Sequence, residues 1–167
     1  MPTNGRILIA DDEELLRRTT AELLSKEGYE CYQADSAESA LETLNGSEFD
    51  LLISDIHMPG NSELELIKEL SGIAEGMPVI LITGSPSVET ATKSIDLPVA
   101  AYMSKPLDFE LLLKHIKSSI TNYRTYRSVQ NTSERLQEWQ KDLDSIKEAV
   151  SNALDTASPV PVNTFFK

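Results

Sequence analysis

The feature of the sequence that most restricts its fold is a regular alternation of short apolar runs with longer segments of helical periodicity. The runs are Arg6–Ala10, Tyr29–Gln33, Asp50–Ser54, Pro78–Ile82 and Val99–Met103. Several consist almost wholly of Ile, Leu and Val, which is typical of parallel strands covered on both faces. The run Tyr29–Gln33 is more polar, so we expect an edge strand there.

The segments between the runs have the spacing of amphipathic helices. They are Glu13–Lys26, Ala37–Leu44, Leu64–Leu70, Ser87–Ile95 and Phe109–Ile120. Five strands alternating with five helices form a (βα)5 pattern. Because parallel strands are joined by right-handed crossovers, the pattern predicts an α/β fold with an open, doubly wound sheet of five parallel strands.

Local signals refine the expected helices. Capping-box spacing joins Asp35 to Glu38, Ser85 precedes Pro86 as an expected N-cap, and Asp108 is an expected N-cap of the fifth helix. One stripe of the first helix is expected to face the sheet, formed by Leu15, Leu16, Thr19, Leu23 and Leu24.

The net charge of −12 is carried entirely by residues 1–120, and residues 121–167 are neutral overall. An acidic domain should repel nucleic acid and anionic membranes. The longest apolar runs fall far short of the roughly 18 residues that span a bilayer, so no membrane insertion is expected. We see no signal peptide, and the single cysteine, Cys31, is consistent with a cytoplasmic protein.

The charge boundary suggests a first domain at 1–121, a helical extension at 122–158 and an irregular tail at 159–167. Heptad spacing in the extension is shown by Val129, Leu136, Leu143 and Val150, with Thr132, Trp139, Ile146 and Ala153 at the complementary offset. This spacing favours a coiled-coil homodimer through 129–157, in which Asp142 and Lys147 pair between parallel helices. A helix folded back on its own domain is the alternative, and a helix break near Asn131 stays open.

Acidic residues follow two strands that this topology makes neighbours. Asp11 and Asp12 come after the first strand and Asp55 after the third. These carboxylates should converge at the carboxyl edge of the sheet, where they repel unless a cation is present. Mg²⁺ is therefore the expected cofactor. The alternative, that each residue only caps a helix or turn, accounts for one of them better than for all three.

Two further polar residues end strands at the same edge. Thr83 follows the fourth strand and Lys105 the fifth. A lysine beside carboxylates balances their charge, and it also suits a transferred phosphoryl group. The Lys105–Pro106 bond is a candidate for the cis form.

Four motifs stand in order at these strand ends: ILIADDEE, DLLISDIHMPG, ILITGSPSVETA and YMSKPLD. Over roughly residues 4–121 the chain resembles the receiver domain of two-component response regulators. The resemblance implies a flavodoxin-like fold and a phosphorylation-activated signalling switch of a phosphorelay. It also implies a phospho-acceptor, which assists its own phosphotransfer and slow dephosphorylation, in place of a turnover enzyme. A sensor histidine kinase or histidine phosphotransfer protein would be the partner.

Roles follow from the resemblance position by position. Asp55 would accept the phosphoryl group. Asp12, Asp55 and the backbone carbonyl of His57 would bind Mg²⁺, and Asp11 would hold a metal-bound water.

The resemblance also covers the groups that respond to phosphorylation. Thr83 would hydrogen-bond the phosphoryl oxygen, Lys105 would pair with it, and Tyr102 matches the switch aromatic. The chain departs from the usual pattern at Glu63, where a glycine is common, and at Pro98-Val99, where Gly-Ala is common.

Other functions are weaker matches. A phosphatase with an aspartate nucleophile usually has Asp-x-Asp after the first strand, where this chain has Ala-Asp-Asp-Glu. A flavin or nucleotide binder needs a phosphate loop there, which acidic side chains would repel. Whether the chain is a stand-alone adaptor or a receiver from a larger protein stays open.

Overall fold

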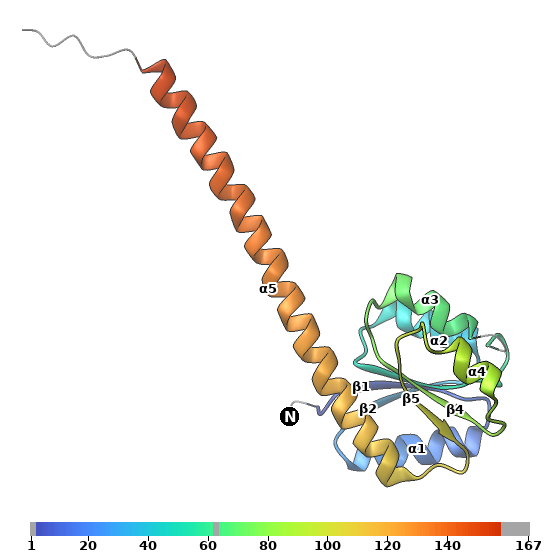
Figure 1. Cartoon of the computed structure of the whole chain (residues 1–167). Helices are drawn as coiled ribbons and strands as arrows, with labels where there is room; N and C mark the ends of the chain where they lie inside the picture. Colours follow the sequence, from blue (N-terminus) through green and yellow to red (C-terminus); the bar gives the residue numbers. More distant parts are fainter. Residues whose placement is uncertain (1–2, 62–63, 158–167) are drawn as a thin grey trace, which may run out of the picture. The chain divides into compact units, whose positions relative to one another are not determined.

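The computed structural model describes residues 3–61 and 64–157 and contains one sheet of five parallel strands (Figure 1). The strands are β1 (Arg6–Ala10), β2 (Glu30–Ala34), β3 (Leu51–Asp55), β4 (Val79–Thr83) and β5 (Val99–Ser104). The helices are α1 (Glu14–Lys26), α2 (Ala37–Gly46), α3 (Glu65–Ile73), α4 (Val88–Lys93) and α5 (Phe109–Thr156). The strand order is β2-β1-β3-β4-β5, so the predicted fold class is confirmed and β2 is an edge strand.

Strands β2, β3, β4 and β5 each end one residue later than predicted, and in two of them the added residue is a candidate for the functional site. Asp55 is the last residue of β3 and Thr83 is the last residue of β4. Asp55 pairs in register with Ile82, and Thr83 with Ser104. Asp55 and Thr83 therefore lie within the sheet, where the hydrogen bonds between strands fix their backbone, and not in the loops that follow the strands.

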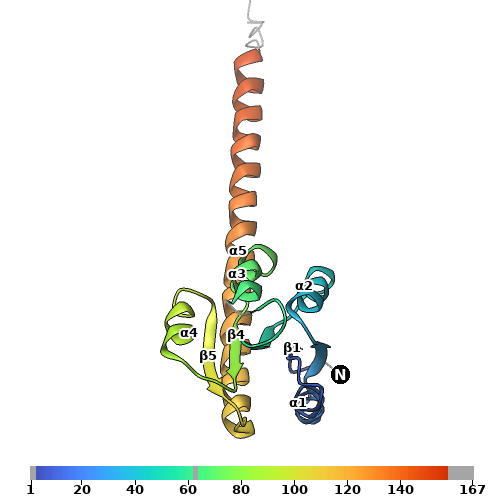
Figure 2. The same ribbon diagram turned by 90° about the vertical axis from the view of Figure 1, so that its right-hand side faces the viewer.

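The core has two layers because successive strand residues face opposite sides of the sheet. On one face, Ile7 and Ile9 pack in a cluster with residues of α1 and of the first part of α5. On the other face, Leu8 and Ala10 pack with residues of α2 and α3. Figures 1 and 2 show the corresponding arrangement of helices on both faces of the sheet.

The expected inner stripe of α1 is wrong in part. Leu15 is 81% exposed, whereas Thr20, Ala21 and Leu24 are the buried residues of α1. The inward face also includes Arg17, whose guanidinium donates to the main-chain carbonyl of Asp11 at 2.6 Å. A search for apolar residues alone does not find Arg17, because a long charged side chain can pack its aliphatic part inward while its charged end forms a hydrogen bond.

Two of the three predicted caps are displaced. Ser36 caps α2 and forms a capping box with Ser39, in place of the Asp35–Glu38 pair. Ser87 caps α4 by accepting from the N–H of Thr90, whereas the N–H of Ser85 donates to Oγ1 of Thr83 at the end of β4.

The third cap is confirmed, since Asp108 accepts from the N–H of Leu111 at 3.0 Å. The start of α3 also differs from the prediction. Leu64 has a left-handed φ of 62° and α3 begins at Glu65. The departure at Glu63 lies outside the described residues.

Helix α5 continues through Asn131 without a break. The chain divides into two compact units, Met1–Thr125 and Tyr126–Lys167, and the predicted tail 159–167 lies outside the described residues. In the first unit α5 buries Leu112, Ile116 and Ile120. Among the described helices, none is both long enough and apolar enough to cross a membrane.

Candidate functional site

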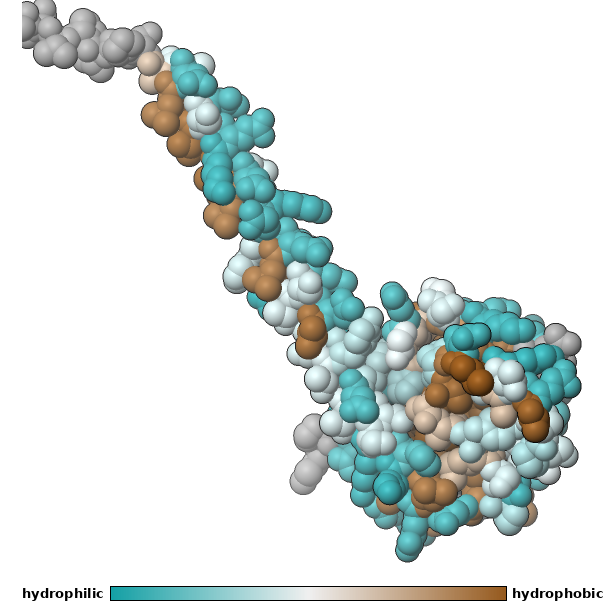
Figure 3. All heavy atoms as spheres, in the orientation of Figure 1, coloured by the Kyte–Doolittle hydropathy of each residue, from teal (hydrophilic) through white to brown (hydrophobic). Residues whose placement is uncertain are grey.

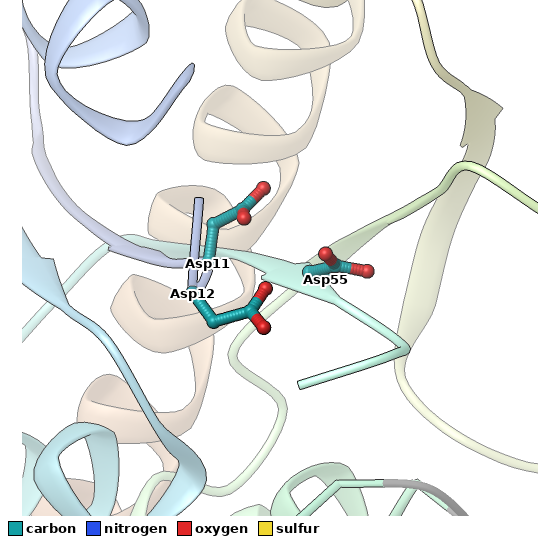
Figure 4. A group of neighbouring side chains, drawn as sticks. All are labelled: Asp11, Asp12 and Asp55. Atoms are coloured by element: carbon teal, nitrogen blue, oxygen red, sulfur yellow. The ribbon is translucent and has the colours of Figure 1, made fainter. Parts of the chain in front are cut away.

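The carboxyl ends of four neighbouring strands supply the polar residues of one site. Asp11 and Asp12 follow β1, Asp55 ends β3, and a carboxylate oxygen from each lies within 4.8 Å of the others. Figure 4 shows Asp11 and Asp12 beside one another, with Asp55 across from them. Asp11 and Asp55 are buried, and Asp12 is exposed. The predicted convergence of these three side chains is present in the structure.

Lys105 lies at the centre of this acidic cluster. Its Nζ is 2.8 Å from Oδ2 of Asp55, 3.1 Å from Oδ2 of Asp11 and 2.6 Å from Oε1 of Glu13. Burial opposes the charged ammonium, but hydrogen bonds to Asp55, Glu13 and Asp11 raise the pKa of Lys105 above its ordinary value. The Lys105–Pro106 bond is cis, as predicted. Lys105 therefore carries a fixed positive charge that bridges β1 and β3.

Asp11 is held from several directions. One carboxylate oxygen accepts from the N–H of Glu13 at 2.8 Å and the other pairs with Lys105. Burial raises the pKa of Asp11, while the Glu13 N–H and Lys105 oppose this shift. Asp11 is thus a positioned carboxylate whose charge depends on its cationic neighbours.

The backbone after Asp55 is fixed by a buried asparagine that the sequence argument missed. Asn61 Nδ2 donates to the main-chain oxygen of Asp55 at 2.9 Å, and its Oδ1 accepts from the N–H of Leu66 at 3.1 Å. Asn61 is 0% exposed. Its side chain therefore ties the end of β3 to the first turn of α3. An asparagine after Met-Pro-Gly looks like an ordinary turn residue, so the sequence carried little signal for this role.

His57 contributes through its backbone in this structure. Its N–H donates to Oδ1 of Asp55 at 2.9 Å, so both oxygens of the Asp55 carboxylate have partners. Glu13 was not among the predicted site residues, although its place beside Asp11 and Asp12 in the motif was the available signal. It supplies a fourth carboxylate to the cluster.

Thr83 and Tyr102 lie in separate hydrogen-bonded groups. Thr83 Oγ1 accepts from the N–H of Ser85 at 3.0 Å, and its carbonyl accepts from the N–H of Lys105 at 2.8 Å. The Tyr102 hydroxyl is 2.7 Å from Oγ1 of Thr90, at the first turn of α4. The structure thus places Thr83 beside Lys105 through a main-chain hydrogen bond and links Tyr102 to α4, a contact with Thr90 that the sequence did not predict.

The donor set fits a magnesium ion. Mg²⁺ prefers oxygen ligands and commonly takes one or two carboxylates together with waters. Asp11, Asp12, Asp55 and Glu13 bring four negative charges, against which Lys105 sets one positive charge. A divalent cation would offset part of the excess negative charge at the site. A surface pocket at this place is lined by Asp12, Glu13, Asp55, His57, Gly84, Ser85 and Lys105, which leaves the cluster accessible.

Comparison with known proteins agrees with this geometry. The family model of the response regulator receiver domain matches residues 7–117. A receiver domain protein (CheY-like) from Methanospirillum hungatei superposes with a TM-score of 0.69 at 31% identity, covering 72% of this chain and 97% of that chain. Response regulator RR06 of Streptococcus pneumoniae is 33% identical over 117 residues, 70% of this chain and 54% of its own length.

Relatives of two lengths occur. Sporulation initiation phosphotransferase F of Bacillus subtilis is 29% identical over 75% of this chain, and the match spans 98% of that protein. In several longer relatives the match spans between 26% and 58% of the protein. The residues matched by the family model include all five strands and the four strand ends that carry the acidic site of this chain. The chain belongs to the family of response regulator receiver domains.

Proposed function

We propose that the chain is a phosphorylation-controlled switch in which Asp55 accepts a phosphoryl group from a phosphohistidine. The observation that carries the proposal is the position of Lys105, 2.8 Å from Asp55 and 3.1 Å from Asp11. A cation held against a carboxylate that lines a surface pocket is arranged to pair with an anionic group entering that pocket. The partner would be a sensor histidine kinase or a histidine phosphotransfer protein.

The chemistry requires little from the protein beyond position and charge. An oxygen of Asp55 attacks phosphorus, an O–P bond forms, and the P–N bond to the histidine ring breaks. The electron pair stays on the ring nitrogen, which then takes a proton from solvent. Lys105 pairs with the transferred group, and the His57 N–H orients the attacking carboxylate.

A bound Mg²⁺ would supply positive charge that offsets the charge of the phosphoryl oxygens. We propose that Asp12, Asp55 and the main-chain carbonyl of His57 hold it, with Asp11 acting through a water. Support comes from the all-oxygen donor set and from the excess of carboxylates over cations at the site.

The proposed output is a conformational change that starts at Thr83. Its Oγ1 already accepts from Ser85, so its own O–H can donate to a phosphoryl oxygen. We propose Tyr102 as the aromatic group that responds, exchanging its partner Thr90 for an inward position. We propose that the receiver domain comprises residues 1–121 and that a separate helical extension comprises residues 122–158. A cytoplasmic location is proposed, consistent with the single Cys31.

Replacing Asp55 with asparagine tests the proposal directly. We expect wild-type protein incubated with acetyl phosphate and Mg²⁺ to gain one phosphoryl group by intact mass spectrometry. Asp55→Asn should gain none, because the amide is a far weaker nucleophile of nearly the same shape. EDTA should suppress the adduct in the wild type.

The matched control is Asp35→Asn, which makes the same change at an exposed position outside the acidic cluster. It should be phosphorylated like the wild type. An adduct of equal yield on Asp55→Asn would refute Asp55 as the acceptor.

A further inference from the structure

The second compact unit presents an apolar stripe along one face of its helix. The large apolar side chains of α5 beyond residue 125 are 44–70% exposed: Tyr126, Val129, Leu136, Trp139, Leu143, Ile146, Val150 and Leu154. Figure 3 shows brown side chains following one side of this helix, with teal side chains beside them. Apolar area of this extent on an isolated helix is unfavourable in water, so we expect a partner surface to cover it.

The spacing of the stripe identifies the kind of partner. Val129, Leu136, Leu143 and Val150 fall at one heptad position, and Trp139 and Ile146 fall at the complementary one. A seam of about two apolar positions in seven is narrower than the face a helix presents to a globular core. It has the width that another helix with the same repeat can cover.

The charges beside the seam set the direction of that helix. If Leu143 is placed at position a of the heptad, Asp142 falls at position g and Lys147 at position e. Parallel, in-register helices place g of one chain beside the following e of its partner. Two equivalent Asp142–Lys147 contacts would then form across a two-fold axis.

This pairing has no counterpart within one helix. Residues five positions apart do not face each other, whereas those three or four apart do. The structure accordingly pairs Lys147 with Asp144, three positions away, at 3.6 Å. A coupling between Asp142 and Lys147 therefore requires a second chain.

We infer that residues 129–157 form a parallel, two-stranded coiled coil with a second copy of this chain. The seam supplies the affinity, and the Asp142–Lys147 pairs supply the register and direction. The inference rests on the second unit alone and does not depend on phosphorylation of Asp55.

Leu143→Glu is the first test, with mass measured by light scattering behind a sizing column. We expect twice the 18.5 kDa of one chain for the wild type and the mass of one chain for Leu143→Glu. Ser145→Glu adds the same side chain two residues away, on the outer face, and should remain a dimer. A monomeric wild type, a trimer, or a Leu143→Glu protein that stays dimeric would each overturn the inference.

A charge exchange tests direction separately. Asp142→Lys and Lys147→Asp should each weaken the dimer about tenfold, because both cross-chain contacts become repulsive. The double variant should regain most of the wild-type dissociation constant. In an antiparallel pair g faces g and e faces e, so exchange would bring no such recovery and the parallel arrangement would be refuted.

Discussion

Replacing Lys105 with methionine should lower the free energy of unfolding by about 3 kcal/mol when no divalent cation is present. The Lys105 side chain is 14% exposed, and its partners Asp11 and Asp55 are 3% and 4% exposed. Methionine keeps most of the length of the stem but removes the ammonium. Two buried carboxylates then face each other without their shared cation, which is the costly way to break a buried ion pair.

Urea denaturation in EDTA measures this loss. Lys68→Met, an exposed position on α3, is the matched control and should stay within about 0.5 kcal/mol of the wild type. If the cluster binds Mg²⁺ as proposed, adding the metal should stabilise Lys105→Met more than the wild type, because competition from the ammonium is gone. Equal free energies of unfolding for Lys105→Met and the wild type in EDTA would show that the ion pairs of Lys105 with Asp11 and Asp55 do not stabilise the fold.

Replacing Asn61 with alanine should cost about 2 kcal/mol of unfolding free energy. The change leaves the Leu66 N–H without its side-chain partner in a fully buried place, and the Asp55 carbonyl keeps only the longer hydrogen bond from Ser54 Oγ at 3.2 Å. An unsatisfied buried polar group costs more than a lost surface hydrogen bond.

Asn45→Ala is the control for Asn61→Ala, since Asn45 is exposed on α2. Chemical denaturation should show little change for that variant. If Asn61→Ala unfolded at the same urea concentration as the wild type, water or a rearranged loop would be replacing both hydrogen bonds, and Asn61 would not be the tie between β3 and α3.

The sheet and the converging carboxylates could be predicted because few folds are compatible with the alternating apolar runs and helical segments of this sequence. Continuous apolar runs such as Ile7–Ala10 must be covered on both faces, and the helical segments between them force parallel strands. Once β1 and β3 are neighbours, residues at their ends must meet at one edge. Asp11, Asp12 and Asp55 therefore came together in the prediction for a topological reason.

The details that failed depend on local competition among polar groups. Several serines stand near the starts of α2 and α4, and hydrogen bonds that become visible only in three dimensions select Ser36 and Ser87. Asn61 is buried because the chain folds the loop inward after β3, although its neighbours in sequence suggest a surface turn. Its hydrogen-bond partners Ser54, Asp55 and Leu66 lie five to seven residues away, and such contacts leave no periodic pattern in the sequence.

Locating the modified residue shows whether Asp55 itself receives the phosphoryl group. Borohydride reduces an aspartyl phosphate to homoserine, so protein treated with acetyl phosphate and Mg²⁺ can be reduced, digested and sequenced by mass spectrometry. We expect homoserine at position 55 alone. Homoserine at position 11 or 12, or an unmodified peptide around Asp55 in protein that carries the phosphoryl group, would contradict it.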